Sequence, residues 1–357
     1  MRNSFKTHCA EVVPAPFVPW VAAAMALAGV AGGGEEVLRE EPLHDGPVDP
    51  GERAFQEVGW DTVWSVGGRD DTLLHRPSAL RPHREGLVVW DQGRFQVLAF
   101  DEEGELEWRF GAEGEGPDEF QDVSDLQVAT DGRVFVYDHA NQRVTVLRPD
   151  GAVERRVGLA DVPRSNTLAV PGDTMLAFVS MSSPVDPLQV LDLDGNEVFR
   201  GDFPWDGFTN LSTISRQGRA HSLGDRWAYA FLITNGWFGF EGLESMDYFG
   251  GFVEHQGLPT VVERRSRDET NQRLAERPRC TACALSISDS LLVVHHGGHS
   301  DHARALLDLY RWDDGTYVGS RLLPGSVRQA MAVGDLVYTL EEDPFPVLTA
   351  LRRVDPE

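Results

Sequence analysis

Cysteine, basic residues and enzyme motifs are all scarce in this sequence of 357 residues. It has 3 cysteines, which excludes a small fold stabilised mainly by several disulfides. Lys and Arg number 32 against 57 Asp and Glu, a formal net charge of -25. This charge excludes nucleic acid and an anionic membrane surface as partners, because no basic field exists to release phosphate counterions. No phosphate loop, dinucleotide fingerprint or Gly-x-Ser-x-Gly elbow occurs, so no common enzyme motif assigns an activity.

The N-terminal residues predict a targeting segment followed by a linker. Arg2 and Lys6 precede an apolar run from Phe17 to Ala31 that is short for a membrane span but suits a signal-peptide core. Residues 1–31 are therefore predicted to be a signal peptide, with an uncleaved N-terminal anchor as the alternative. The protein is expected to be secreted or periplasmic, touching a membrane only through that anchor. Residues 32–59, rich in Gly, Pro and acidic residues, are predicted to be a linker.

A repeated unit follows, and it is clearest between Gly111 and Gly158. Short apolar runs alternate there with turn residues, which predicts four antiparallel strands in about 45 residues, the size of one propeller blade. The chain has 36 Gly and 21 Pro, a composition that suits tight turns. Four Asp-Gly pairs are predicted to form two-residue hairpin turns: Asp131-Gly132, Asp150-Gly151, Asp194-Gly195 and Asp314-Gly315.

Six such units fill residues 60–357. The other five lie at about 76–110, 166–203, 219–252, 280–323 and 327–354, and residues 263–279 before the fifth are predicted to be a surface loop or short helix. The sixth unit lacks a fourth strand. The segment from Asp61 to Val66 is predicted to supply it, because an unpaired sheet edge would expose a row of backbone donors and acceptors. We therefore predict an all-β, six-bladed propeller of four-stranded blades, closed by an N-terminal strand.

The second unit resembles an NHL repeat. Its Gly114-x-Gly116-Pro117 motif, its Val134 to Asp138 run and its Asn141-x-Arg143 step carry the resemblance, and the six-blade plan is similar to bacterial secreted or periplasmic propellers. Members of that family share a fold but differ in biochemical function, which ranges from ligand and partner binding to lactone hydrolysis and lyase chemistry. The resemblance therefore implies the fold and leaves the function open.

Loops at one end of the predicted propeller carry candidate ligand-binding residues. The connections between the second and third strands, and from one blade to the next, share this end, which we name the top face. Carboxylates near the channel rim on this face suit an acid, a base or a cation ligand. The predicted ligand-binding residues are Asp91, Asp122, Asp125, Asp138, Asn141 and Arg143.

Cysteine and histidine gather at the same rim in the fifth unit. Cys280-x-x-Cys283 opens its inner strand, and His295, His296, His299 and His302 occupy a nearby loop. A zinc site built from Cys280, Cys283, His296 and His299 is one interpretation. A local disulfide between the two cysteines and a pair of free thiols are the others, and export through an oxidising compartment favours the disulfide.

Two functions remain open from the sequence. The favoured one is a non-catalytic module that binds a protein or a small-molecule or saccharide ligand, because no catalytic set converges. The alternative is a propeller-type hydrolase or lyase with a metal at the channel mouth. No cofactor is expected for the first, whereas zinc or calcium would serve the second. Aromatic residues from Trp227 to Phe252 are predicted to fill the space between blades, with stacking on a sugar or peptide as the alternative.

Overall fold

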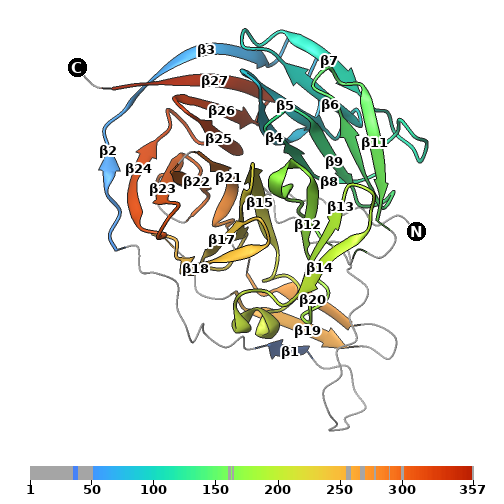
Figure 1. Cartoon of the computed structure of the whole chain (residues 1–357). Helices are drawn as coiled ribbons and strands as arrows, with labels where there is room; N and C mark the ends of the chain where they lie inside the picture. The colour runs from blue at the N-terminus through green and yellow to red at the C-terminus, as the bar shows by residue number, and fades with distance from the viewer. Residues whose placement is uncertain are drawn as a thin grey trace.

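The computed structural model describes residues 35–38, 51–159, 162, 165–254, 259–265, 270–276, 279–288, 290–298 and 301–355. Six β-sheets form a ring around a central axis, and a seventh, smaller sheet lies outside it (Figure 1). Among the described residues no helix is long and apolar enough to cross a membrane. The predicted signal peptide, residues 1–31, lies outside the described part of the chain.

The first, second and fourth blades are four-stranded antiparallel meanders. The first contains β4 (Pro77–His83), β5 (Gly86–Asp91), β6 (Gln96–Phe100) and β7 (Leu106–Phe110). The second contains β8 (Val123–Val128), β9 (Val134–Asp138), β10 (Arg143–Leu147) and β11 (Val153–Gly158). The fourth contains β15 (Gly218–Leu223), β16 (Arg226–Phe231), β17 (Trp237–Glu241) and β18 (Glu244–Gly250). The first strand of each blade is the innermost, next to the axis (Figure 1).

The third blade departs from the predicted four strands. It has β12 (Met175–Val179), β13 (Leu188–Asp192) and β14 (Glu197–Gly201), and its inner strand is reduced to one bridge between Ala169 and Ala177. The short 3-10 helix η1 (Pro171–Asp173) follows that bridge and ends the extended backbone, because proline cannot donate to a ladder. A second 3-10 helix, η2 (Asp206–Asn210), connects this blade to the fourth.

The fifth blade gains a strand that the sequence did not predict. Its antiparallel strands are β21 (Ala282–Ile287), β22 (Leu291–His296), β23 (Leu306–Arg311) and β24 (Tyr317–Leu322). β2 (Phe55–Gln56) pairs in parallel with the outer edge of β24, although residues 32–59 were predicted to be a linker. Structure therefore begins before Trp60, because Arg53 anchors this segment to Asp308 and Ser320 of the blade.

The sixth blade closes the ring as predicted. It contains β25 (Gln329–Val333), β26 (Leu336–Glu341) and β27 (Val347–Val354), and β3 (Gly59–Gly67) is its fourth strand. The β3–β27 register runs from Val347 opposite Gly67 to Val354 opposite Gly59. The six-bladed, all-β architecture and its closure by the N-terminal strand are thus confirmed.

Residues 263–279, predicted to be a loop or short helix, belong in part to a hairpin. β19 (Val261–Arg265) and β20 (Thr270–Leu274) pair with each other, and β1 (Glu35–Leu38) pairs with β19. This second strand within residues 32–59 again shows that the predicted linker is partly ordered by pairing. Val261 and Val262 at the start of β19 are buried, but the charged residues that follow them hide the strand period in the sequence.

The Asp-Gly turns differ in detail from the prediction. Gly132, Gly151, Gly195 and Gly315 have φ of 83°, 81°, 86° and 70°, but the preceding aspartates do not have positive φ. The Gly132 amide donates to the Ala129 carbonyl at 2.9 Å. The backbone bonds that close the turns at Gly132, Gly151 and Gly195 enclose three residues each, and the bond between Arg311 and Thr316 encloses four. The predicted two-residue turns were therefore one or two residues too short.

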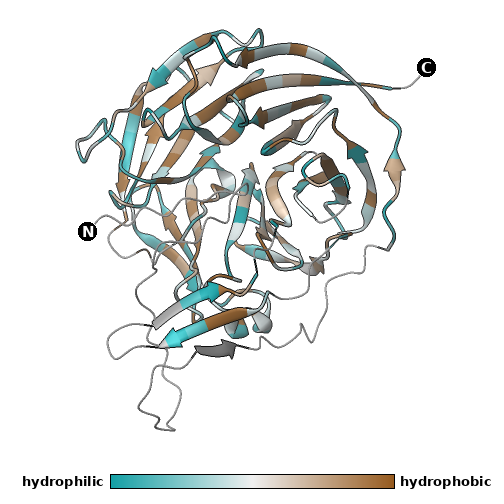
Figure 2. Ribbon diagram, turned by 180° about the vertical axis from the view of Figure 1, so that it is seen from behind, coloured by the Kyte–Doolittle hydropathy of each residue, from teal (hydrophilic) through white to brown (hydrophobic). Residues whose placement is uncertain are grey.

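The core lies between blades. Trp90 and Val97 of the first blade pack against Leu126, Val136 and Leu147 of the second, all nearly or fully buried. Figure 2 shows hydrophobic residues running along the strands of the ring. Most aromatic rings of the fourth blade are buried in the same way: Trp227 stacks on Phe240 with centroids 3.9 Å apart. The blades thereby hold their inner strands in fixed positions around the axis.

Candidate functional site

The top-face end of the central channel holds a small cavity. It is lined by residues from five inner strands or from positions next to them, including Ser78, Arg81, Asp125, Arg219, Cys283 and Arg328. The cavity has a volume of about 40 Å³, enough room for about three waters. The cavity therefore suits a group of a few atoms. The three arginines and Asp125 are the charged residues among those that line it.

Arg81 and Asp125 form a buried ion pair across the channel. Arg81 Nη2 donates to Asp125 Oδ1 at 2.7 Å, and both side chains are 6% exposed. Asp125 Oδ2 also accepts from the Leu168 amide at 3.0 Å and from Thr167 Oγ1 at 3.2 Å. These donors compensate the carboxylate, as a buried charge requires. Burial lowers the pKa of Arg81, and Asp125 opposes that shift.

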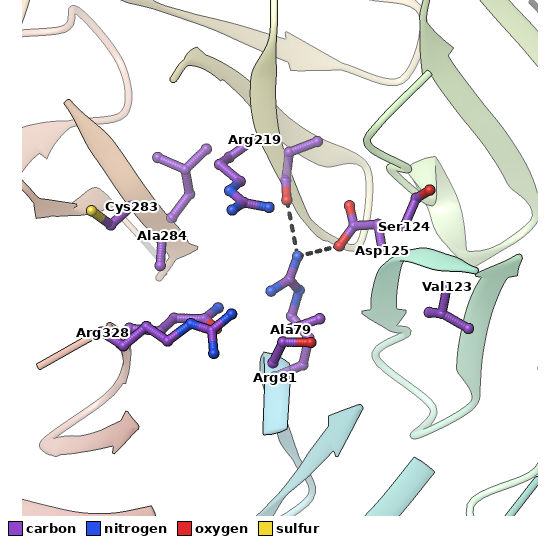
Figure 3. A pocket seen from close by; sticks show the side chains of 13 residues that line it. Ala79, Arg81, Val123, Ser124, Asp125, Arg219, Cys283, Ala284 and Arg328 are labelled. Atoms are coloured by element: carbon purple, nitrogen blue, oxygen red, sulfur yellow. Dashed lines mark hydrogen bonds and ion pairs between the residues drawn. The ribbon is translucent and has the colours of Figure 1, made fainter. Parts of the chain in front are cut away.

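The Arg81 side chain also reaches the fourth blade. Its Nη2 lies 3.4 Å from the Ala220 carbonyl oxygen (Figure 3). Gln127 Nε2 donates to the same oxygen at 3.0 Å. Arg81 Nε is buried and makes no hydrogen bond within the described residues. Because an unsatisfied buried donor is costly, this N–H is a ready partner for an acceptor inside the channel.

Arg219 and Arg328 bring two further guanidinium groups to the cavity. Figure 3 shows the three arginine head groups directed toward one space from the first, fourth and sixth blades. Arg328 Nη1 donates to Glu342 Oε1 at 2.7 Å and to the Pro77 carbonyl at 3.2 Å. The charge of Arg219 contributes to lowering the pKa of Arg81, so the positive charges act on one another. Such a cluster is stabilised by an anion that contacts more than one guanidinium.

His221 lies near the three arginines but does not add to their positive charge. Burial, and then the charge of Arg81, lower the pKa of His221 to about 3. Its Nδ1 accepts from the Ile287 amide at 3.3 Å, which ties β15 to β21. His221 is therefore a neutral acceptor at ordinary pH and holds two inner strands together.

Most of the predicted ligand-binding residues hold loops. The Asp91 carboxylate accepts from the His75 and Arg76 amides at 2.7 and 2.9 Å, and it is fully buried. Asp138 is equally buried and accepts from the amides of Gln121 and Asp122 in the same way. Both aspartates end the second strand of their blade, so they are equivalent anchors of the connection to the inner strand.

Asn141, Arg143 and Asp122 lie around one loop of the second blade. Asn141 Nδ2 donates to the Gly114 carbonyl at 3.0 Å, and Arg143 Nη2 donates to the Gly116 carbonyl at 2.6 Å. The Asp122 backbone contributes hydrogen bonds to Asp138 and His139. Asn141 and Arg143 thus shape the Gly114–Gly116 loop, whereas Asp122 contacts the end of β9. None of the three lines the cavity, and Asp125 is the predicted residue that does.

Cys280 and Cys283 are joined by a disulfide, with Cα atoms 5.7 Å apart. His296 is buried, and its Nε2 lies 3.4 Å from Glu254 Oε2. His299 lies outside the described residues. Among the residues that are described, no group of three or more His, Cys, Asp or Glu side chains could hold a metal ion.

Comparison with known proteins agrees with this architecture. A family model described as a 6-bladed β-propeller (DUF5128) matches residues 66–218, which span the first three blades. The chain folds as a six-bladed β-propeller. No curated protein matches the chain.

Solved structures with the same fold are distant in sequence from this propeller. A protein of Bacteroides fragilis described as exported is 12% identical, with a TM-score of 0.54 over 88% of this chain and 98% of its own. A member of the DUF4221 family from Bacteroides vulgatus is 10% identical, with a TM-score of 0.50 over 84% and 99%. Virginiamycin B lyase from Staphylococcus aureus is 10% identical, with a TM-score of 0.51 over 84% and 100%. At these identities the likeness shows the fold alone.

Arg81, Arg219 and Arg328 were not predicted as site residues from the sequence. Arg219 and Arg328 lie at or just before the start of an inner strand, and Arg81 is the fifth residue of β4. No motif spaces them, since they belong to blades far apart in the chain. The usable signal was weak: a lone arginine at the entry to an apolar strand, in a chain with far more acidic than basic residues. Ring closure is what brings the three together.

Proposed function

We propose that this propeller is an extracytoplasmic binding module that takes an oxyanion group of a small-molecule ligand, a carboxylate, sulfate or phosphate, into the mouth of its channel. The observation that carries the proposal is the convergence of Arg81, Arg219 and Arg328 on one cavity. Guanidinium groups suit oxyanions because they donate in a planar fork. An extracytoplasmic location is supported by the apolar run near the N-terminus and by the disulfide, and a structural neighbour is described as exported.

The size and burial of the cavity define which part of the ligand enters. Space for about three waters accommodates a carboxylate or a tetrahedral oxyanion but not a sugar ring. The net charge of -25 repels anions at long range, so recognition depends on contacts inside the cavity rather than on electrostatic steering. The rest of the ligand would lie on the surrounding loops of the top face.

Anion titration of arginine variants tests the proposal. Acetate, sulfate and phosphate are titrated by calorimetry into the wild type and into Arg219→Gln and Arg328→Gln. A charge-assisted hydrogen bond contributes about 1.5–3 kcal/mol, so each variant is expected to bind the preferred anion about 10-fold or more weakly. Arg155→Gln is the control, because Arg155 pairs with exposed Asp194 far from the channel. Equal affinity in all four proteins, or no binding of any anion, would refute the proposed site.

A further inference from the structure

The Cys280–Cys283 disulfide lies in the wall of the same cavity. Cys283 lines the cavity together with Ala284 and Leu285. The β21–β22 register pairs Ala282 with His296 and Ala284 with His295, which leaves Cys283 as the extra residue of a β-bulge. Bulges redirect side chains and are common beside functional sites. The disulfide therefore fixes the one irregular step of an inner strand, at the point where that strand lines the cavity.

Global stability does not account for this bond. The two cysteines are three residues apart, and the chain entropy that a cross-link removes from the unfolded state grows with the length of the loop it closes. A loop this short therefore contributes less to the free energy of unfolding than a long one would. The position of the bond in the bulge points instead to a local role.

The disulfide is tightly packed on the side of Gly297. A Cβ added at Gly297 would lie 2.7 Å from both sulfur atoms and 2.2 Å from the Cys280 carbonyl oxygen, so this glycine packs directly against the bond. The Thr281 amide donates to the Leu232 carbonyl at 2.7 Å, and the Gly297 amide donates to the Thr281 carbonyl at 3.2 Å. Unbonded sulfurs lie farther apart than bonded ones, so breaking the bond must displace this tightly held segment.

We propose that the Cys280–Cys283 disulfide is a redox-sensitive clasp whose reduction by a small dithiol weakens binding of the oxyanion; this rests on the proposed function of the cavity. One thiolate of the dithiol attacks one of the two sulfurs and forms a mixed disulfide. The second thiol of the dithiol then attacks the mixed disulfide and displaces the cysteine sulfur. The dithiol leaves as a cyclic disulfide, and the protein gains two electrons and two protons and ends with two thiols.

The effect travels through the backbone of the bulge. Figure 3 shows the Cys283 sulfur pointing away from the three guanidinium groups, so the new thiol does not itself contact the anion. Displacement of Cys283 carries Ala284 and the cavity wall with it. Both cysteines are at most 3% exposed, so small dithiols react slowly and bulky ones more slowly still.

Binding and redox state must then be linked in both directions. If reduction weakens sulfate binding by some factor, saturating sulfate must make reduction unfavourable by the same factor. Coupling between sites usually spans about 5- to 150-fold. We expect at least about 5-fold here, because the bulge contributes directly to the cavity wall.

Calorimetric titration of sulfate into the oxidised protein and into protein reduced with dithiothreitol tests the clasp. Because Cys9 adds one thiol, titration of the denatured full chain should count one free thiol in the oxidised protein and three in the reduced protein. Circular dichroism confirms that the reduced propeller stays folded. Sulfate binding at least 5-fold weaker after reduction, with the Cys280→Ser/Cys283→Ser variant weak in both conditions, supports the clasp. Equal affinity of oxidised and reduced protein overturns the clasp but leaves the oxyanion site standing. No sulfate binding in either state overturns both.

Discussion

Replacing Asp125 by asparagine should destabilise the propeller more than replacing Arg81 by methionine. Both side chains are 6% exposed, so each charge is compensated mainly by the other and by its hydrogen-bond partners rather than by bulk water. Without the carboxylate, Arg81 stays buried close to Arg219, whose charge already opposes its own. Breaking a buried pair in this way costs about 3–5 kcal/mol. In Arg81→Met the carboxylate keeps its bonds from Leu126, Leu168 and Thr167, so the cost should be about 1–3 kcal/mol.

Urea unfolding of both variants and of the double variant, at one pH and salt concentration, measures this difference. The double variant should be less destabilised than Asp125→Asn, because it removes the unpaired charge as well. An Asp125→Asn cost below about 1 kcal/mol would mean that water solvates Arg81 in the channel. A cost for Arg81→Met larger than that for Asp125→Asn would refute the reasoning from hydrogen-bond partners.

Two other predictions concern stability. The pKa of His221 lies at about 3 and that of His295 at about 4, both below the ordinary 6.5, so the unfolded chain takes up protons first as the pH falls. The free energy of unfolding should therefore fall between about pH 6.5 and 4 by roughly 1.4 kcal/mol per pH unit for each histidine, and urea melts of His221→Asn that keep the full slope would contradict this. Arg53→Ala should cost about 2–4 kcal/mol by leaving the buried Asp308 without its cation, whereas thermal melts should show no loss for Arg155→Ala. A deletion that reaches Arg53 is thus expected to destabilise the domain, contrary to the linker interpretation of residues 32–59.

Local sequence patterns predicted the six-bladed ring but not the extra strand β2 that pairs with its fifth blade. The apolar runs and Asp-Gly pairs between Gly111 and Gly158 have fixed local periods, and the unpaired edge of the last blade required a partner that only Asp61 to Val66 could supply. β2 escaped because two residues carry no periodicity. Its pairing depends on the contact of Arg53 with Asp308, which are 255 residues apart.

The candidate site was predicted less well than the fold, because the sequence does not show what a polar residue at a strand end will contact. Asp91 and Asp138 were chosen as rim carboxylates, but polar residues at strand ends are as often used to satisfy backbone amides, and both do so here. The top face was predicted to bind ligand because loops on a rigid scaffold often carry binding residues, and the arginine cavity lies at that end. Its arginines come from blades one, four and six, so only the folded ring shows that they are neighbours.

Closure of the ring by β3 and β27 sets the order of events during synthesis. Ser65 and Thr349 face each other across 284 residues, and joining chain ends over that distance costs roughly 5 kcal/mol of loop entropy. The first five blades can form as the chain emerges, but β3 has no partner until β27 has been made. Until then it presents an open strand edge, so a chaperone that holds this segment during synthesis would protect the protein at its most aggregation-prone stage.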